Sequence, residues 1–429
     1  MKTLIRGGRV IDPANGIDDV LDVLLESGEV AALAKSIGAP DAEVIDASGQ
    51  VVAPGFVDLH VHLRTPGQEH KETIATGTRA AVAGGFTTIC CMPNTDPPIH
   101  DRSVAELVLS QARAAGFAKV IPLAAVSPSL KHETLTEMAD LKAAGCAAVS
   151  DDGKAIQSSS FLRRILEYAS MLDLPVVLHC EDYGLSEGGA MNEGYQSTVL
   201  GLKGMPREAE EVGIMRAILL AKCTGAHVHF CHVSTAYGVE MIRRAKAEGV
   251  RVTAEATPHH FSLTDEDVGR QNYDTNTKMV PPLRTADDVA ALVEGLKEGT
   301  IDGIATDHAP HATEDKEVEY DQAAFGIVGL ETALGVTLKY LVEPGHVSLS
   351  DAVAMLTCRP AAALKLSAGT LTPESAADVV VFNPTQKWTV DPGKFHSRGR
   401  NTPYARCKLL GVVSHTLVDG RTVHTHPAT

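Results

Sequence analysis

Histidine and aspartate residues stand at the carboxyl ends of several short apolar segments of this 429-residue chain. The first segment, residues 57–63, carries His60 and His62, whose side chains share one face if the segment is a strand. Neutral imidazoles are common zinc ligands, and two of them at this spacing supply half of a site. Most isolated H-x-H pairs lie on a surface or in a core, so this pair is evidence only if other ligands gather beside it.

Further ligand types recur at corresponding positions of later apolar segments. Asp152 lies near the end of residues 146–153, and His179, His232 and Asp307 lie near the ends of three later segments. Imidazoles and carboxylates that converge on one opening form a nitrogen and oxygen set suited to a pair of zinc ions. The pattern therefore predicts a binuclear zinc centre, provided that the fold brings these segment ends together.

The segments that carry these residues alternate with helix-like stretches rich in alanine, glutamate and arginine. The apolar segments are residues 57–63, 87–94, 119–127, 146–153, 175–182, 227–234, 251–260 and 302–311. Such alternation is typical of a parallel sheet buried on both faces. Eight segments within one stretch of chain favour a closed (β/α)8 TIM-type barrel, and no G-x-G-x-x-G motif supports a dinucleotide-binding sheet. The active site of such a barrel lies at the carboxyl ends of its strands.

The two ends of the chain differ from this middle part. Residues 1–53 and 366–429 consist of short strand-like runs separated by turn residues, with no helix-length segment among the first 53. We expect the two ends to form one small β-sandwich domain. The barrel, residues 54–365, is then inserted between the two parts of that domain.

Composition narrows the class of partner. Lys and Arg number 38 against 54 Asp and Glu, a net charge of −16, which argues against nucleic acid or an anionic membrane as a partner. No apolar run reaches the length of a transmembrane helix, and the first residues do not resemble a secretory signal. The eight cysteines form no C-x-x-C pair, as expected of reduced thiols. We therefore expect a cytoplasmic protein that acts on a small molecule.

Nine motifs occur in order along the barrel: DLHVHLRTPG, CMPNTDPP, SDDG, LHCED, CHVST, TPHH, PPLR, IATDHAPH and FGIVGLET. Together they resemble the dihydroorotases of the bacterial class I type, in the amidohydrolase superfamily. The H-x-H and TDH motifs are shared across the superfamily, whereas HLR with P-G, MPNT and ATDHAPH are much narrower. The match extends into both β-rich ends. It implies reversible cyclisation of N-carbamoyl-L-aspartate to L-dihydroorotate, a step of pyrimidine (UMP) biosynthesis.

The resemblance also assigns roles to residues of this chain. It implies two zinc ions per chain, with six ligands: His60, His62, Asp152, His179, His232 and Asp307. Asp152 would bridge the metals, where many amidohydrolases use a carboxylated lysine, and Lys154 is a less favoured substitute. Asp307 would be the catalytic residue that accepts a proton from the attacking water and delivers it to the leaving nitrogen.

Substrate binding follows from the same resemblance. Arg64 and Asn94, with His311, would bind the substrate carboxylate, because a guanidinium offers it a fork of donors. The remaining substrate contacts are expected from His62, Phe325 and Gly326. Residues 311–326 would be either a mobile lid or a solvated surface loop. Val280 stands where the family usually has asparagine, so any contact from that side chain is absent here.

Several neighbours of these residues have more than one interpretation. Asp151 and the two cysteines Cys180 and Cys231 would face away from the site, because adjacent strand residues point in opposite directions. His259 and His260 would either hydrogen-bond to the metal ligands or belong to the core.

Two other functions compete with the leading one. Another cyclic-amide hydrolase, such as a dihydropyrimidinase, hydantoinase or allantoinase, would commonly keep a bridging lysine and needs no carboxylate fork. A non-catalytic scaffold for aspartate carbamoyltransferase would have lost metal ligands, whereas all six positions are filled here. A homodimer and an association with aspartate carbamoyltransferase are further expectations.

Overall fold

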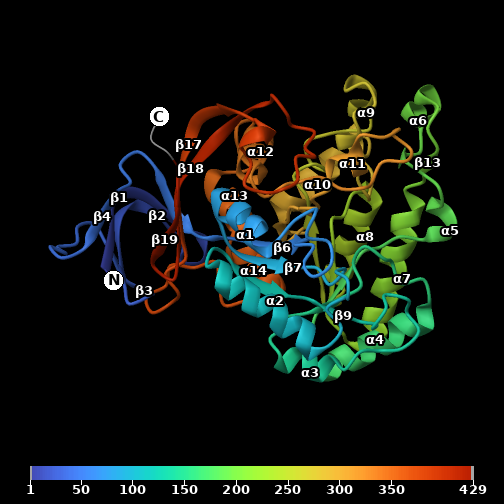
Figure 1. Ribbon diagram of the computed structural model, residues 1–429, viewed down its shortest axis with the longest axis horizontal. Helices are drawn as coiled ribbons and strands as arrows, with labels where there is room; N and C mark the ends of the chain where they lie inside the picture. The colour runs from blue at the N-terminus through green and yellow to red at the C-terminus, as the bar shows by residue number, and fades with distance from the viewer. Residues whose placement is uncertain (1, 427–429) are drawn as a thin grey trace.

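The computed structural model describes residues 2–426, and the strands of both chain ends lie to one side of a middle part rich in helices (Figure 1). In this middle part, eight parallel strand positions form a closed barrel. The strands are β6 (Phe56–Val61), β7 (Phe86–Cys91), β8 (Lys119–Pro122) continued by β9 (Ala124–Ala125), β10 (Val149–Ser150), β11 (Val176–Leu178), β14 (Val228–Phe230), β15 (Val252–Ala256) and β16 (Gly303–Ile304). Each pairs in parallel with the next. The backbone N–H of His62 donates to the carbonyl of His308 at 2.8 Å and closes the ring. The predicted (β/α)8 barrel is confirmed.

Amphipathic helices pack around the barrel. The larger ones are α1 (Ile74–Ala83), α2 (Arg102–Ala115), α4 (Ser159–Met171), α7 (Glu208–Thr224), α8 (Ala236–Ala247), α10 (Ala286–Glu298) and α13 (Leu349–Leu356). In α4 the side chain of Ser158 caps the first turn, and Phe161, Leu162, Ile165, Leu166 and Ala169 are the buried residues. Their spacing places one apolar stripe against the strands. None of the helices within residues 2–426 has both the length and the apolar character to cross a bilayer.

Shorter elements lie in the connections. The helices are α3 (Met138–Ala143), α5 (Tyr183–Ser186), α6 (Tyr195–Leu200), α9 (Glu266–Arg270), α11 (Thr313–Lys316), α12 (Ala333–Thr337) and α14 (Cys358–Ala363). Single helical turns are η1 (Pro13–Asn15), η2 (Thr275–Thr277), η3 (Leu338–Val342) and η4 (Pro392–Lys394), and β12 (Met191–Asn192) pairs with β13 (Gly204–Met205).

The two ends of the chain share one eight-stranded sheet. Its order is β19 (Arg421–Thr425), β18 (Lys408–Val418), β17 (Val379–Thr389), β5 (Val51–Pro54), β1 (Lys2–Asp12), β2 (Ile17–Glu26) and β3 (Glu29–Ala34), with β4 (Glu43–Asp46) on β1. β17 pairs antiparallel with β5, which joins the late strands to the early ones. Valine and isoleucine residues from both ends form a core of their own. The β domain formed by both chain ends is confirmed, and we propose boundaries at 53/54 and 365/366.

Candidate active site

The six predicted metal ligands lie together at the carboxyl ends of the barrel strands. His60 is within β6, and His62 follows that strand's last residue, Val61. The other four come directly after strands β10, β11, β14 and β16, within three residues of the last strand position: Asp152, His179, His232 and Asp307. All six side chains are buried. The structure therefore brings every one of these residues to one place.

The carboxylate of Asp152 lies between two pairs of histidines. Its Oδ2 is 3.2 Å from His60 Nε2 and 3.6 Å from His62 Nε2. Its Oδ1 faces the second pair, at 3.7 Å from His232 Nε2 and 3.9 Å from His179 Nδ1. Two adjoining ligand sets thus share one carboxylate, which is the arrangement that a bridging ligand between two cations requires.

Asp307 completes the first ligand set. Its Oδ1 lies 3.1 Å from His62 Nε2 and 3.5 Å from His60 Nε2. Burial raises the pKa of Asp307, but the imidazole of His60 and the hydrogen bond with His62 outweigh it and hold that pKa well below its usual range. The pKa of Asp152 is lowered in the same way by the surrounding imidazoles. Two buried carboxylates are therefore ionised at neutral pH and favour positive charge at this place.

Three of the imidazoles are oriented by acceptors outside the centre. In each, the ring nitrogen remote from the centre bonds to an oxygen acceptor at 2.9 Å: His60 Nδ1 to Glu255, His62 Nδ1 to Asn94 and His179 Nε2 to Glu181. With that nitrogen as the donor, the nitrogen facing the centre is the one that would give its lone pair to a bound cation, in place of any proton it shares with a carboxylate. Asp152 Oδ1 is buried and has no hydrogen-bond partner. Imidazole nitrogens and anionic oxygens that face one another are suited to bind divalent cations. Two groups of side chains that include His60 lie close enough together to hold a metal ion: His60, Asp152, Cys231 and His232, and His60, His62 and Asp307.

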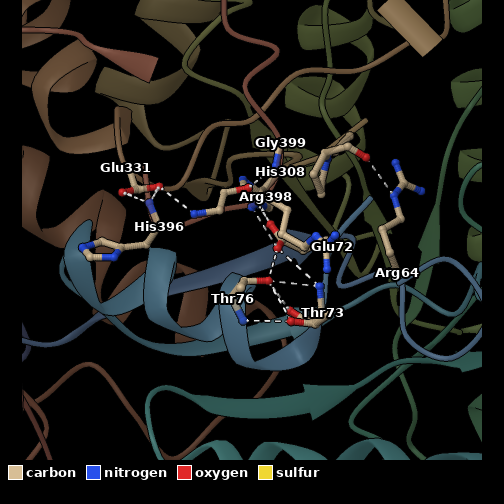
Figure 2. A network of polar contacts seen from close by, with 12 residues as sticks. Arg64, Glu72, Thr73, Thr76, His308, Glu331, His396, Arg398 and Gly399 are labelled. Atoms are coloured by element: carbon tan, nitrogen blue, oxygen red, sulfur yellow. Dashed lines mark hydrogen bonds and ion pairs between the residues drawn. The ribbon is translucent and has the colours of Figure 1, made fainter. Parts of the chain in front are cut away.

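Arg64 lies at the edge of this centre as a buried cation without an ion pair. Its side chain is 8% exposed, and its Nε–H donates to the carbonyl of Pro310 at 3.3 Å (Figure 2). Burial lowers the pKa of Arg64 to about 10, which still leaves it protonated at neutral pH. Among residues 2–426 no carboxylate forms a salt bridge with this guanidinium. A buried charge is costly without a partner, so this one suits an anionic ligand.

Asn94 contacts a predicted metal ligand through one end of its amide. Its Oδ1 accepts from His62, which leaves Nδ2 for a ligand. Gly153, with φ at +85°, is packed against that nitrogen, and a Cβ at this position would lie 2.6 Å from Asn94 Nδ2. Glycine is therefore required here both by the backbone conformation and by the closeness of the amide.

Comparison with known proteins identifies the family of this site. A model described as dihydro-orotase-like matches residues 49–237, and an amidohydrolase family model matches residues 221–424. A dihydroorotase of Anaeromyxobacter sp. (strain K) is 54% identical over 421 residues, covering 98% of this chain and 97% of that protein. The chain belongs to the dihydroorotase family. A dihydroorotase of Caldanaerobacter subterraneus subsp. tengcongensis is 52% identical over the same length and coverage.

Solved structures place this dihydroorotase-family chain among cyclic-amide hydrolases. The L-hydantoinase (dihydropyrimidinase) from Arthrobacter aurescens is 28% identical with a TM-score of 0.87, covering 99% of this chain and 96% of that one. The dihydropyrimidinase from Brevibacillus agri NCHU1002 is 24% identical with a TM-score of 0.85, covering 99% and 95%. The latter likeness shows the fold alone. With the sequence relatives, the chain is a cyclic-amide hydrolase of the metal-dependent amidohydrolase superfamily.

The loop after β16 brings together the remaining residues expected to bind substrate. His311 Nε2 donates to the carbonyl of Phe325 at 2.8 Å, and Gly326 follows directly. Burial, with the charges of Arg64 and Lys316, lowers the pKa of His311 to about 3, so its imidazole is neutral.

Residues 311–326 combine exposed and buried positions, so they match the solvated surface loop of the alternative interpretation only in part. They contain α11, and Lys316 and Tyr320 are each only 6% exposed. The Lys316 ammonium donates to the carbonyl of Ala324 at 2.7 Å, because a buried ammonium needs such acceptors. Movement of this segment as a lid stays a prediction.

The predicted direction of Cys231 is wrong. Its Sγ lies within 4.8 Å of ligand atoms of His60, Asp152 and His232 rather than facing away. The reason is local: β14 ends at Phe230 and His232 has a φ of +32°, so strand alternation does not extend across these residues. Cys180 is buried in the main core as expected.

The other residues near the predicted ligands make contacts outside the ligand cluster or none. Asp151 accepts from the N–H of Val126 and the hydroxyl of Ser127, both at 2.7 Å, and Lys154 is exposed. His260 bonds to Thr257 and to the carbonyl of Pro281, while His259 Nε2 is buried without a partner. Neither histidine hydrogen-bonds to a metal ligand within residues 2–426. Val280 borders a small cavity together with His179 and Glu181.

Glu255 is the buried residue of this dihydroorotase-family site that motif reasoning missed. It lies in β15, is 1% exposed, and bonds through Oε1 to His60 Nδ1 at 2.9 Å and through Oε2 to His229 Nε2 at 3.1 Å. Burial raises its pKa, but the hydrogen bonds to His229 and His60 outweigh it and lower the pKa to about 2. A signal existed in the sequence: a glutamate inside an apolar run is rarely buried without a partner.

We expect Glu255→Gln to weaken metal binding by about 10- to 100-fold, because the residue that orients a ligand histidine tunes its basicity. Competition with a metallochromic chelator measures the affinity. Glu248→Gln is the matched control, since Glu248 is exposed and pairs only with Lys222. Unchanged affinity in the Glu255 variant would show that His60 keeps its orientation without this carboxylate.

Proposed function

We propose that the chain is a zinc-dependent dihydroorotase that interconverts N-carbamoyl-L-aspartate and L-dihydroorotate in de novo pyrimidine biosynthesis, with two zinc ions per chain. The ligands would be the six buried residues at the barrel mouth: His60, His62, Asp152, His179, His232 and Asp307. The main observation that supports this proposal is that the two carboxylate oxygens of Asp152 face two different pairs of histidines. The Arg64 cation, which has no ion pair among residues 2–426, lies beside them.

When bound, zinc supplies Lewis acidity, which makes hydroxide available at neutral pH and polarises an amide carbonyl. The residues of the chain do the rest. Asp307 is ionised and held at 3.1 Å from His62, so its carboxylate would take the proton from the attacking water and deliver it to the leaving ring nitrogen. In the direction of ring closure the same carboxylate would take a proton from the attacking nitrogen.

The substrate carboxylate would be bound at the edge of the centre. The free guanidinium nitrogens of Arg64 offer it two parallel charge-assisted hydrogen bonds, and Asn94 Nδ2 offers another donor. His311 would turn from the carbonyl of Phe325 to complete the set, with Phe325 and Gly326 against the ring and His62 beside it. These contacts would favour a ring with a carboxylate over one without.

Hydantoinase or dihydropyrimidinase activity is the alternative that the likeness to the Arthrobacter aurescens structure supports. The two functions differ in the substrate group opposite Arg64. An assay of the purified protein on dihydroorotate and on dihydrouracil distinguishes them, and we expect turnover of dihydroorotate to dominate. Faster turnover of dihydrouracil would overturn the proposal.

Metal removal tests the centre itself. We expect the purified protein to carry up to two zinc ions per chain and to lose its activity on treatment with a strong chelator, because the buried carboxylates and lone pairs then have no cation. Metal analysis beside the assay measures both, and mock dialysis without chelator is the control. Full activity in a preparation shown to be free of metal would end this mechanism.

Location and assembly are proposed on composition and family alone. We propose a cytoplasmic homodimer, with association to aspartate carbamoyltransferase as a further option. Light scattering of the purified chain, with and without the transferase, tests both assemblies.

A further inference from the structure

One segment of the C-terminal part of the chain contacts the loops at the carboxyl ends of the barrel strands. Residues 395–404 lie in the connection between η4 and β18, and buried polar contacts attach them to the barrel (Figure 2). The hydroxyl of Ser397 donates to Glu72 Oε2 at 2.5 Å, and the N–H of Arg398 donates to Glu72 Oε1 at 3.2 Å. Glu331 accepts the N–H of His396 at 2.9 Å. The segment is therefore held in a fixed position relative to the first barrel helix.

Asn401 is the residue of this segment that contacts the loop after β16, which carries the residues expected to bind substrate. It is 4% exposed, and its Nδ2 donates to the carbonyls of Ala309 at 3.0 Å and Gly326 at 3.1 Å. Its Oδ1 accepts the N–H of His311 at 3.1 Å. Its own carbonyl accepts from the N–H of Val328. The side-chain amide of Asn401 thus uses both of its N–H donors and one acceptor site to link the start of this loop, at Ala309 and His311, to its end at Gly326.

The loop held in this way also holds Arg64. Ala309 and His311 flank Pro310, and the carbonyl of Pro310 is the acceptor for Arg64 Nε at 3.3 Å. We infer that Asn401 is a positioning residue that sets the Arg64 guanidinium for the substrate carboxylate. This inference rests on the proposed role of Arg64. It gives the β domain a part in substrate binding, without contact with substrate or metal.

The orientation of the Arg64 guanidinium depends on its contact with this loop. Arg64 has one fixed bond through Nε, so the plane of its two remaining nitrogens follows the position of the Pro310 carbonyl. A bidentate pair with a carboxylate needs that plane to be aligned. Loss of Asn401 would leave the carbonyls of Ala309 and Gly326 without these donors, and the loop between them would shift. Misplacement of a binding group by about 1 Å can cost up to about 10²-fold.

Steady-state kinetics of Asn401→Ala test this inference. We expect the KM for dihydroorotate to rise by about 10-fold or more, with kcat within about threefold of normal, because the metal centre is untouched. Zinc content should be unchanged. Asn383→Ala is the matched control, since the side chain of Asn383, in β17, accepts only from Thr385 and Gln386 among residues 2–426. Normal KM in the Asn401 variant, or a loss confined to kcat, would overturn the inference.

Asn401→Gln provides a second variant if the alanine protein does not fold. Glutamine keeps the amide but places it one methylene further out, so the bonds can form only if the loop moves. A positioning role predicts a raised KM in this folded variant. A residue that only supports the fold would leave the kinetics of the glutamine variant normal.

A double-mutant cycle with Arg64→Met separates this inference from the proposed function. If Asn401 acts through Arg64, its alanine substitution should change KM by less than about threefold once Arg64 is replaced. Additive effects would overturn the inference, since they show action by another route. If Arg64→Met alone leaves KM unchanged, the role proposed for Arg64 fails instead. A raised KM for Arg64→Met with a normal KM for Asn401→Ala rejects only the role of Asn401.

Discussion

Asp307→Asn is expected to lower kcat for ring opening of dihydroorotate by about 10²- to 10⁴-fold, the range for loss of a general acid or base. Asparagine has the shape of aspartate but cannot accept the proton. Asp307 lies 3.1 Å from His62 and carries a lowered pKa, so the native side chain is an anion placed at the reacting centre. The other five ligand candidates remain in the variant.

Zinc content and thermal unfolding of this variant separate proton transfer from metal binding. We expect both to change little, because Asp152 still faces both histidine pairs. Asp287→Asn is the matched control, since Asp287 is exposed in the first turn of α10 and forms no ion pair among residues 2–426. Near-normal turnover in Asp307→Asn would move the proton-transfer role to another residue.

The barrel was predictable because its strands are buried on both faces. Such strands appear as continuous apolar runs, and the active-site face of a barrel is always at their carboxyl ends. Residues 175–182, for example, contain β11, and His179 follows that strand directly. The convergence of His60 with Asp152 and Asp307, far apart in the chain, followed from this rule alone. No knowledge of side-chain distances was needed.

The residues that orient the site were harder to predict. Glu255 is a single charged residue in an apolar strand, and its partners His60 and His229 lie on two other strands. Asn401 comes from an irregular segment of the other domain, and its contacts are mostly with backbone atoms. Backbone recognition leaves no mark in the sequence of the residues recognised. Cys231 was misplaced because a strand ended one residue earlier than alternation assumes.

The burial of Lys316 within residues 311–326 was also not predictable from the sequence pattern. Residues 311–326 are acidic and lack apolar periodicity, which resembles a solvated loop. Lys316 is nevertheless buried, because its ammonium donates to the carbonyls of Lys278 and Ala324. A lysine whose methylene groups and charge are both satisfied by a fold cannot be told from a surface lysine by sequence pattern.

Arg64→Met is expected to separate dihydroorotate from dihydrouracil. Methionine keeps much of the apolar stem but removes every donor, and loss of a charged hydrogen bond costs about 1.5–3 kcal/mol. The kcat/KM for dihydroorotate should therefore fall by about 10- to 150-fold. Any slow activity on dihydrouracil should be nearly unchanged, because that ring has no carboxylate for Arg64 to bind. Parallel assays of both substrates measure the ratio.

Lysine at position 64 and a remote control complete this test. Arg64→Lys should restore the activity only in part, since an ammonium supplies charge without the planar fork. Arg113→Met, on the exposed face of α2, should leave both substrates unaffected. Equal losses on the two substrates in Arg64→Met would show that this arginine supports the loop at Pro310 or the metal centre. The unpaired guanidinium would then have to be explained without a substrate carboxylate, because burial of a charge at 8% exposure still requires an anion or water.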